Sequence, residues 1–322
     1  MQPSSTCIPS NEGFGEGTQK HPLYDPLKSK TYTNLKCSNP LCAGYKPGCS
    51  APRCTYSYGY ADNSSTVGLL GKERLTLTAS DVIDNFVFGC GINNAGIFHE
   101  LQEDGILGLS QSPLSIVQQT ANKYHQIFSA CIPSKPSFSG FLRFGHGGQK
   151  SLVYTPITKI KNDSSSYGIN LIGIAVGGKK LPIPKSLFTK TGSIIDSGTD
   201  VTRLLPEIYK PFRDTYRKAM SKYKLVNPKD VGIDGIDTCH YLGHRKSFKI
   251  PKVSFLLSGG VAVDIPTHGI ARPVLSKVVC FPILGEGVDD GPMIWGNVQH
   301  RTLEVVYDVG KRRIGFGYGD CK

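Results

Sequence analysis

The chain has 322 residues, with 37 lysines and arginines against 25 aspartates and glutamates, and a formal net charge of +12 at pH 7. This length is sufficient for two lobes with separate cores, and no apolar run reaches the roughly 18 residues of a transmembrane helix, so we expect no membrane partner. The 37 glycines and 21 prolines separate short segments rich in Val, Ile, Tyr, Phe and Thr, which predicts a mainly β fold with few helices.

Four of the ten cysteines lie in one short segment, at Cys37, Cys42, Cys49 and Cys54. An even number of cysteines favours disulfides formed in an oxidising compartment. Four cysteines at short range can also hold zinc, but their spacing is not of the paired C-x-x-C type and no histidine lies among them. We therefore favour disulfides and expect neither a metal nor a cofactor.

Residues 55–77 have the pattern of a β-hairpin. Tyr56, Tyr58 and Tyr60 alternate with smaller residues, and Asp62–Ser65 has turn composition. Val67–Leu77 is the expected return strand. The tyrosines of an exposed hairpin are ordinary strand formers, so taken alone this pattern indicates no function.

The following segments predict a short helix, a run of strands and a longer helix. Ser112-Pro113 is expected to open a helix that ends near Tyr124, with the serine as N-cap and the proline at the first position. A second helix is predicted over residues 206–223, because apolar residues recur on one face, although Pro211 should kink it or delay its start. Strands are predicted at residues 154–160, 167–176, 252–257, 261–265, 278–283 and from Thr302 onward.

The segment Ile194–Thr199 carries the strongest indication of chemistry. Two β-branched apolar residues lead into Asp196, then into Ser197, Gly198 and Thr199. The glycine allows a sharp turn, and the two hydroxyls can hold the carboxylate in one orientation. A carboxylate is costly to bury without hydrogen bonds, so Asp196 is either a helix cap or a catalytic group.

Other candidate catalytic groups are weaker. Asp62 lies in the hairpin turn, Asp104 lies in a loop, and Asp200 follows Asp196 too closely to face it. No Ser-His-Asp or Cys-His arrangement with an informative local pattern occurs, and the eight histidines have no metal-binding spacing such as H-E-x-x-H.

Several further segments accompany the Asp196 turn. They are Phe88–Gly91, Gly105–Leu109, Pro113–Ile116, Ile174–Lys179, Thr202–Leu204, Asp237–Cys239, Met293–Gln299 and Leu303–Asp308. Together these motifs resemble the plant nepenthesin-like branch of the pepsin-like aspartic endopeptidases, nearest the subgroup named for a chloroplast nucleoid DNA-binding protein. The resemblance covers nearly the whole chain.

The resemblance implies a bilobal, pepsin-like double β-barrel. Residues 1–150 would form the N-terminal lobe, with a flap hairpin at about residues 55–77, and residues 151–322 the C-terminal lobe. Members of this family hydrolyse peptide bonds with two aspartates that activate a water molecule. Asp196 would be one of them, and Ser197, Gly198 and Thr199 would support it. Tyr60 would cover a polypeptide substrate in the cleft between the lobes of a monomer.

The first Asp-Thr-Gly motif of the family is absent from these residues. Met1-Gln2 resembles the end of a W-x-Q-C stretch that follows this motif in relatives, so we expect a fragment or a mis-started gene model with an incomplete first lobe. The alternative is a catalytically inactive binding or inhibitor-like protein with the same fold.

The resemblance also implies disulfide partners and a compartment. The expected pairs are Cys7–Cys90, Cys37–Cys54, Cys42–Cys49, Cys239–Cys280 and Cys131–Cys321, the last of them between the lobes. The family and the cysteine count together imply an extracellular or secretory location, in the apoplast or vacuole, with the plastid as the alternative. The start of the chain has neither the basic segment nor the apolar core of a signal peptide.

Most of the positive charge lies in residues 151–322. Clusters occur at residues 213–224, at His244–Lys246 and at Lys311–Arg313. Such a face can attract nucleic acid, but no nucleic-acid-binding motif is present, and solvated surface charge is the simpler interpretation. We expect only weak, salt-sensitive binding to DNA.

Overall fold

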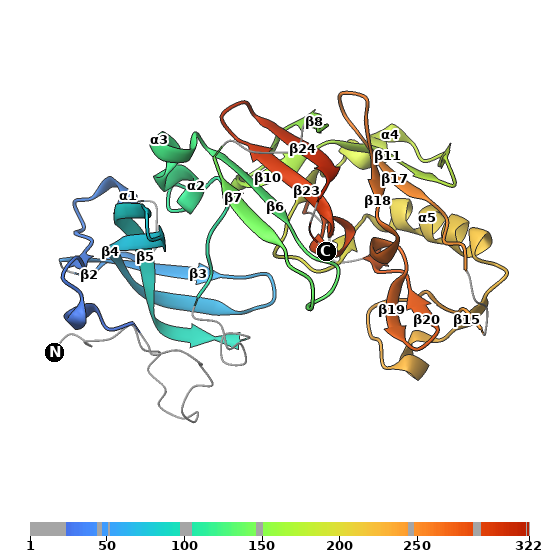
Figure 1. The fold of residues 1–322 in the computed structure, drawn as a ribbon, viewed down its shortest axis with the longest axis horizontal. Helices are drawn as coiled ribbons and strands as arrows, with labels where there is room; N and C mark the ends of the chain where they lie inside the picture. Colours follow the sequence, from blue (N-terminus) through green and yellow to red (C-terminus); the bar gives the residue numbers. More distant parts are fainter. Residues whose placement is uncertain are drawn as a thin grey trace. The chain divides into compact units, whose positions relative to one another are not determined.

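The computed structural model describes residues 24–43, 47–50, 52–96, 105–145, 151–243, 248–285, 291–319 and 321. Strands predominate among these residues, which confirms the predicted mainly β fold (Figure 1). The chain divides into two compact units, one ending at Thr120 and the other beginning at Ala121. In the described part of the chain, every helix is too short or too polar to cross a membrane.

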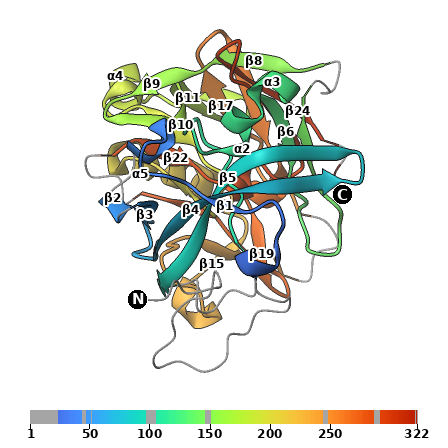
Figure 2. The same cartoon turned by 90° about the vertical axis from the view of Figure 1, so that its left-hand side faces the viewer.

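Unit 1, which ends at Thr120, is built on an antiparallel meander. Its strands are β1 (Thr33–Asn34), β2 (Pro47–Ser50), β3 (Arg53–Gly59), β4 (Ser65–Thr78) and β5 (Asp81–Ala95), in the order β1-β4-β3-β2 with β5 on β4. The predicted hairpin is confirmed, since β3 pairs with β4 up to Gly59 and Ser65. The long strands β4 and β5 run side by side (Figure 2). Of two short helical segments, η1 (Pro26–Lys28) precedes β1 and α1 (Pro40–Ala43) lies between β1 and β2.

The segment Gly105–Leu109 forms no strand in the structure. Its apolar side chains are open to solvent, with Ile106 60% and Leu107 43% exposed. Two short helices follow, α2 (Ile116–Gln119) and α3 (Ala121–Tyr124). The single helix predicted from Ser112 is therefore wrong in its start and continuity.

The start is displaced because Ser115 is the N-cap, and its hydroxyl accepts a hydrogen bond from the Gln118 N–H at 3.2 Å.

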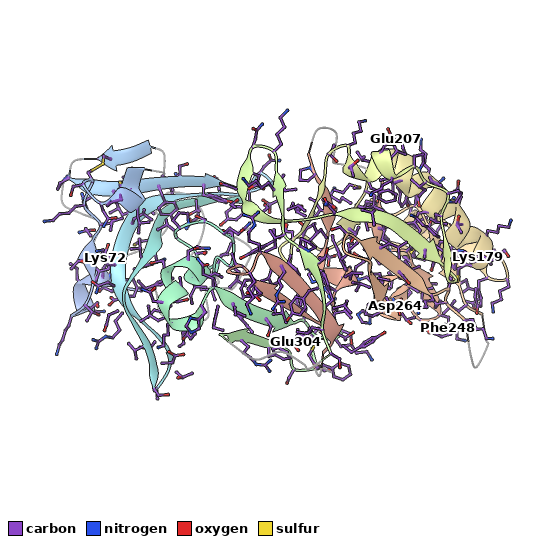
Figure 3. The ribbon with its side chains drawn as sticks, turned by 90° about the horizontal axis from the view of Figure 1, so that it is seen from above. Lys72, Lys179, Glu207, Phe248, Asp264 and Glu304 are labelled. Atoms are coloured by element: carbon purple, nitrogen blue, oxygen red, sulfur yellow. A yellow bond between two sulfur atoms is a disulfide. The ribbon has the colours of Figure 1, made fainter. Side chains whose placement is uncertain are left out.

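Unit 2, which begins at Ala121, contains a five-stranded antiparallel sheet made from both ends of its chain. The strand order is β7 (Phe141–Phe144), β6 (Ile127–Cys131), β23 (Leu303–Asp308), β24 (Arg313–Tyr318) and β8 (Val153–Pro156). Because β6 pairs with β23, the compact unit begins earlier than the lobe boundary expected near residue 150. The buried Glu304 belongs to β23 (Figure 3). Its carboxylate accepts a hydrogen bond from Arg143 of β7 at 3.1 Å.

Three more sheets complete unit 2. One has the order β21 (Ile283–Leu284), β14 (Thr202–Arg203), β22 (Met293–Trp295), β13 (Ser193–Ile195), β10 (Asp163–Ile169) and β9 (Thr158–Ile160). Another has the order β12 (Lys179–Lys180), β11 (Leu171–Val176), β17 (Val253–Leu257) and β18 (Val261–Ile265). The last has the order β15 (Lys224–Val226), β16 (Cys239–Tyr241), β20 (Val278–Cys280) and β19 (Arg272–Leu275). Short helical segments are α4 (Lys185–Thr189), η3 (Pro228–Val231), η4 (Thr267–Gly269) and η5 (Asn297–Gln299).

The longest helix among the described residues, α5 (Pro206–Ala219), confirms the predicted second helix, although it ends four residues early. It begins with Pro206 and contains Pro211. Its buried face carries Ile208, Phe212 and Tyr216. The Tyr216 ring stacks on Phe281, with 4.4 Å between centroids, and thereby ties the helix to the segment after β20.

Two of the expected disulfides are present, and two others have exchanged partners. Cys131–Cys321 and Cys239–Cys280 are bonded, with Cα–Cα distances of 5.9 and 4.0 Å. Both cysteines of the first pair belong to unit 2, so this bond does not link the units as expected. The expected pair Cys7–Cys90 includes Cys7, which lies outside the described residues, whereas Cys90 is disulfide-bonded.

In the cysteine-rich segment of unit 1 the bonds are Cys37–Cys49 and Cys42–Cys54, not Cys37–Cys54 and Cys42–Cys49. Burial explains the partners. Cys42 and Cys54 are 1% and 0% exposed and belong to the core of unit 1, whereas Cys49 is exposed and Cys37 is half-buried. Cys49 and Cys54 lie opposite each other on β2 and β3, so each bonds a cysteine that precedes the hairpin.

Replacing Cys131 and Cys321 by alanine is expected to lower the free energy of unfolding by about 2–5 kcal/mol, because this bond spans 190 residues of chain. The Cys239–Cys280 bond spans 41 residues, so the matched double variant should lose about 1 kcal/mol less. Urea unfolding of the oxidised proteins measures both values. A Cys131→Ala/Cys321→Ala protein with an unchanged midpoint would contradict the expectation.

Candidate active site

Asp196 stands at the end of a buried strand, where the sequence pattern predicts it. Strands β13 and β22 are parallel, with Ile194 opposite Ile294 and Ile195 opposite Trp295. The Asp196 N–H continues this pairing by donating to the Trp295 carbonyl at 3.0 Å. Since parallel strands end at the same edge of a sheet, the turn after Asp196 and the chain after Trp295 lie together.

Both oxygens of the Asp196 carboxylate accept a hydrogen bond from its own turn. The Gly198 N–H donates to Oδ1 at 2.9 Å, and the Thr199 hydroxyl donates to Oδ2 at 2.6 Å. A Cβ atom on residue 198 would lie 3.2 Å from Oδ1, so glycine permits this close approach. A turn rather than a helix follows the half-buried Asp196, which excludes the helix-cap interpretation.

Ser197 supports the turn through its backbone and not, as the sequence suggested, through its hydroxyl. The hydroxyl that holds the carboxylate is that of Thr199, whereas the exposed Ser197 accepts a hydrogen bond at its backbone carbonyl from the Asn297 side chain, at 3.2 Å. Ser197 therefore anchors the turn to the segment after β22.

The segment η5 holds the Asp196 turn through its backbone. The N–H groups of Asn297 and Val298 donate to the carbonyls of Thr199 and Asp200 at 2.7 and 2.9 Å. This contact requires glycine at Gly296, because a Cβ atom there would lie 2.6 Å from the Val201 carbonyl carbon. The Gly-Asn-Val-Gln motif was visible in the sequence, but its role in holding the turn was not.

Gln299 is a fully buried amide whose role sequence reasoning missed. Its Oε1 accepts hydrogen bonds from the N–H and the hydroxyl of Thr202 at 3.0 and 2.7 Å. Its Nε2 donates to the carbonyls of Gly269 and Pro282 at 2.7 and 2.8 Å. The Thr202 hydroxyl in turn accepts from the Gly296 N–H at 3.2 Å. All four hydrogen-bonding positions of this amide are thus occupied, and they join β14 to the carbonyls of Gly269 and Pro282.

Replacing Gln299 by leucine is expected to lower the free energy of unfolding by at least about 3 kcal/mol, because it leaves several buried donors and acceptors without partners. Thr202→Val, which removes one hydroxyl from the same network, should cost less, about 1–2 kcal/mol. Urea denaturation measures both. Equal stability of Gln299→Leu and the parent would show that the network contributes nothing.

Asp200 points away from Asp196, as predicted. Its Oδ2 accepts from Arg272 Nη1 at 2.8 Å, and its Oδ1 accepts from Arg301 Nη2 at 3.4 Å. Arg301 also donates to the Asn297 Oδ1 at 3.0 Å. The sequence offered no indication of these arginine partners, because Arg272 lies far from Asp200 in the chain.

His300 lies next to this turn and is fully buried. Burial, followed by the charge of Arg301, lowers its pKa to about 3, against a smaller raising effect of hydrogen bonds to the backbone of Asp196 and Trp295. Its ring meets Trp295 edge-on, with 6.1 Å between centroids. The imidazole is therefore neutral and packs as part of the support for the turn.

The hairpin tyrosine Tyr60 lies at the end of β3 in unit 1. Its N–H donates to the Ser64 carbonyl at 2.8 Å, and its ring meets Tyr58 with 4.9 Å between centroids. Burial raises the pKa of Tyr60. Tyr58 is 52% exposed, whereas Tyr60 is half-buried. Contact of Tyr60 with a substrate remains a prediction.

Of the weaker acidic candidates, Asp62 has a structural role in the hairpin turn. Asp62 accepts from the Ser64 N–H at 2.9 Å, and this bond lowers the pKa of the Asp62 carboxyl, so Asp62 shapes the turn. Asn63 beside it has a φ of 66°, which asparagine tolerates better than most residues. Asp104 lies outside the described residues.

Comparison with known proteins agrees with this geometry. Residues 5–146 match the family model described as xylanase inhibitor N-terminal, and residues 166–318 match the one described as xylanase inhibitor C-terminal. The soybean basic 7S globulin has a similar structure, with a TM-score of 0.73 and 20% identity, over 90% of this chain and 83% of that one. This likeness shows the fold.

Several plant proteins have a higher sequence identity to this chain. An aspartyl protease family protein of Arabidopsis thaliana is 44% identical over 310 residues, and aspartyl protease AED1 of the same plant is 42% identical over 306. These alignments cover 94% of this chain but 64% of each relative, so the chain spans somewhat less than two thirds of their length. Aspartic proteinase nepenthesin-1 of Nepenthes gracilis is 30% identical over 327 residues, covering 98% of this chain and 71% of that protein. The chain therefore belongs to the plant family of pepsin-like aspartic proteases.

Proposed function

We propose that this chain carries one half of the catalytic centre of an aspartic endopeptidase. The observation that carries the proposal is the Asp196 carboxylate, which stands at the end of a buried strand with one hydrogen bond to each oxygen. These bonds fix the orientation of the carboxylate. A fixed, half-buried carboxylate of this kind is suited to accept a proton from a water molecule that attacks a peptide carbonyl.

The reaction needs a second carboxylate opposite the first. Two close carboxylates share one proton, so the ionised one takes a proton from water and the protonated one polarises the peptide carbonyl. The sequence Asp-Ser/Thr-Gly occurs once in the 322 residues, at Asp196. The second carboxylate of the proposed centre therefore comes from a polypeptide segment other than these residues.

The remaining properties are proposed from the family to which the chain belongs. The proposed substrate is a polypeptide that Tyr60 of the flap hairpin contacts, and the proposed active protein is a monomer. The disulfides favour the secretory pathway or the extracellular space.

A catalytically inactive, inhibitor-like binding protein is the second candidate. Both matching family models are described as parts of a xylanase inhibitor, which favours it. Against it stands the Asp196 turn, which holds a half-buried carboxylate at the end of a buried strand, as the proposed reaction requires.

The test uses the chain extended upstream by a strand that carries an Asp-Thr-Gly-Ser turn. We expect this protein to cleave a denatured protein substrate at about pH 3–5, with inhibition by pepstatin, and Asp196→Asn to lower the rate by about 10²–10⁴-fold or more. Asp264→Asn is the matched control, because Asp264 of β18 is partly exposed and pairs with Lys252, the residue before β17. An extended chain that folds but shows no cleavage dependent on Asp196 would overturn the proposal in favour of the binding protein.

A further inference from the structure

A cluster of charged side chains stands directly beside the Asp196 turn. Asp200 directly follows Thr199, whose hydroxyl donates a hydrogen bond to the Asp196 carboxylate. The two carboxylate oxygens of Asp200 accept hydrogen bonds from Arg272 and Arg301. We propose that Arg272 binds an acidic side chain of the polypeptide that occupies the site. This inference rests on the proposed function in taking a polypeptide as the ligand.

The two arginines of the cluster are used differently. Arg301 is committed to the turn, because its Nε and Nη2 donate to Asn297 Oδ1 at 3.3 and 3.0 Å, in addition to the contact with Asp200. In the part of the chain that the structure describes, the partner of the Arg272 guanidinium is Asp200, through Nη1. The guanidinium has five N–H donors, so the remaining edge of Arg272 is free to bind a further carboxylate.

The charge balance favours an anionic ligand. Each oxygen of Asp200 already accepts from a guanidinium, so two positive charges face one negative charge. A lysine or arginine of the ligand would be repelled by this net positive charge, and each oxygen of Asp200 already bonds an arginine. An aspartate or glutamate would gain a charge-assisted hydrogen bond, bidentate where the geometry allows.

Arg272 is also held in place before a ligand arrives. It begins β19 and lies opposite Cys280 of β20, which is bonded to Cys239 of β16. Its side chain is 41% exposed, so it is accessible while its base is fixed by the sheet and its tip by Asp200. Such preorganisation reduces the entropy that binding costs.

The test is peptide binding to the chain, measured by fluorescence anisotropy at about pH 5.5, where a peptide glutamate with a pKa near 4.3 is ionised. The probes are labelled peptides of one sequence in which each position in turn is Glu, Gln or Lys. At one position we expect Glu to bind about threefold to tenfold more tightly than Gln, and Lys more weakly than Gln. The advantage of Glu over Gln should disappear below about pH 4, as the glutamate becomes protonated.

Two variants should move this preference in opposite directions. Arg272→Gln should abolish it, whereas Asp200→Asn should increase it, because it removes the negative charge that neutralises the arginines. Arg313→Gln is the matched control, since Arg313 is similarly exposed and also bonds an aspartate, Asp308, at 2.9 Å. The control should leave the preference unchanged.

The inference is overturned if the parent binds Glu and Gln peptides equally at every position, if it binds none of them, or if Arg272→Gln retains the preference. Failure of the proposed function would give a different combination of results. Binding that depends on Arg272, together with an extended chain that shows no cleavage dependent on Asp196, would overturn the peptidase and leave the acidic-side-chain site in place.

Discussion

A polypeptide of these 322 residues is expected to show no measurable acid peptidase activity on a denatured protein at about pH 3–5. The mechanism uses two facing carboxylates that share a proton, and the chain contains one Asp-Ser/Thr-Gly turn, at Asp196. Asp62, in the hairpin turn, has a structural role, because its carboxylate accepts a hydrogen bond from the Ser64 N–H. Loss of one acid–base partner typically costs about 10²–10⁴-fold in rate.

The assay compares this polypeptide with the upstream-extended chain at equal concentration. Pairing of two copies would bring two Asp196 turns together, so the assay is repeated over a range of protein concentrations. Cleavage by the unextended polypeptide that is inhibited by pepstatin and abolished by Asp196→Asn would show that the second carboxylate lies within these residues or in a second copy.

The second large effect concerns stability in acid. In the described part of unit 2, burial keeps three histidines neutral: the pKa of His300 is lowered to about 3, that of His240 is lowered to about 4, and that of His268 is also lowered. In the unfolded chain each titrates near 6.5. The unfolded state therefore binds more protons below pH 6.5, and folding stability falls as the pH drops from there toward the folded pKa values.

The size of this loss follows from the shifts. Each pKa unit corresponds to about 1.4 kcal/mol, so His240 and His300 together are expected to remove several kcal/mol of unfolding free energy between about pH 6.5 and 4. Carboxylates with lowered pKa values, such as Asp237 and Asp264, contribute stability that is present above their unfolded pKa near 3.9 and lost below it. The histidines therefore dominate at mild acidity and the carboxylates at stronger acidity.

Urea unfolding at several pH values between about 7 and 4.5 isolates the histidine contribution. His240→Phe should flatten the pH dependence of the unfolding free energy in this range, because His240 is fully buried, neither ring nitrogen has a hydrogen-bond partner among the described residues, and the ring packs edge-on against Tyr216. A matched change in the neighbouring ring, Tyr216→Phe, removes no group that titrates in this range and should leave the slope unchanged. A parent protein with equal stability at pH 7 and 4.5 would contradict the assignment of neutral buried histidines.

The sequence by itself determined the features that depend on neighbouring residues. The alternating tyrosines and the turn at Asp62 predicted the hairpin of β3 and β4, and the spacing of Ile208, Phe212 and Tyr216 predicted α5, because strand and helix periods are local properties. The Asp196 turn was also readable, since its two hydrogen-bond donors lie within three residues of the carboxylate.

Only the tertiary structure decided the features that join distant segments. Spacing alone did not indicate that Cys42 would be buried with Cys54 and leave Cys37 to Cys49, because burial depends on how the whole unit packs. The four hydrogen bonds of Gln299 join Thr202, Gly269 and Pro282, and the partners of Asp200 are Arg272 and Arg301. A buried amide or an ion pair between segments has no periodic pattern in sequence, because its energy comes from groups that folding alone brings into contact.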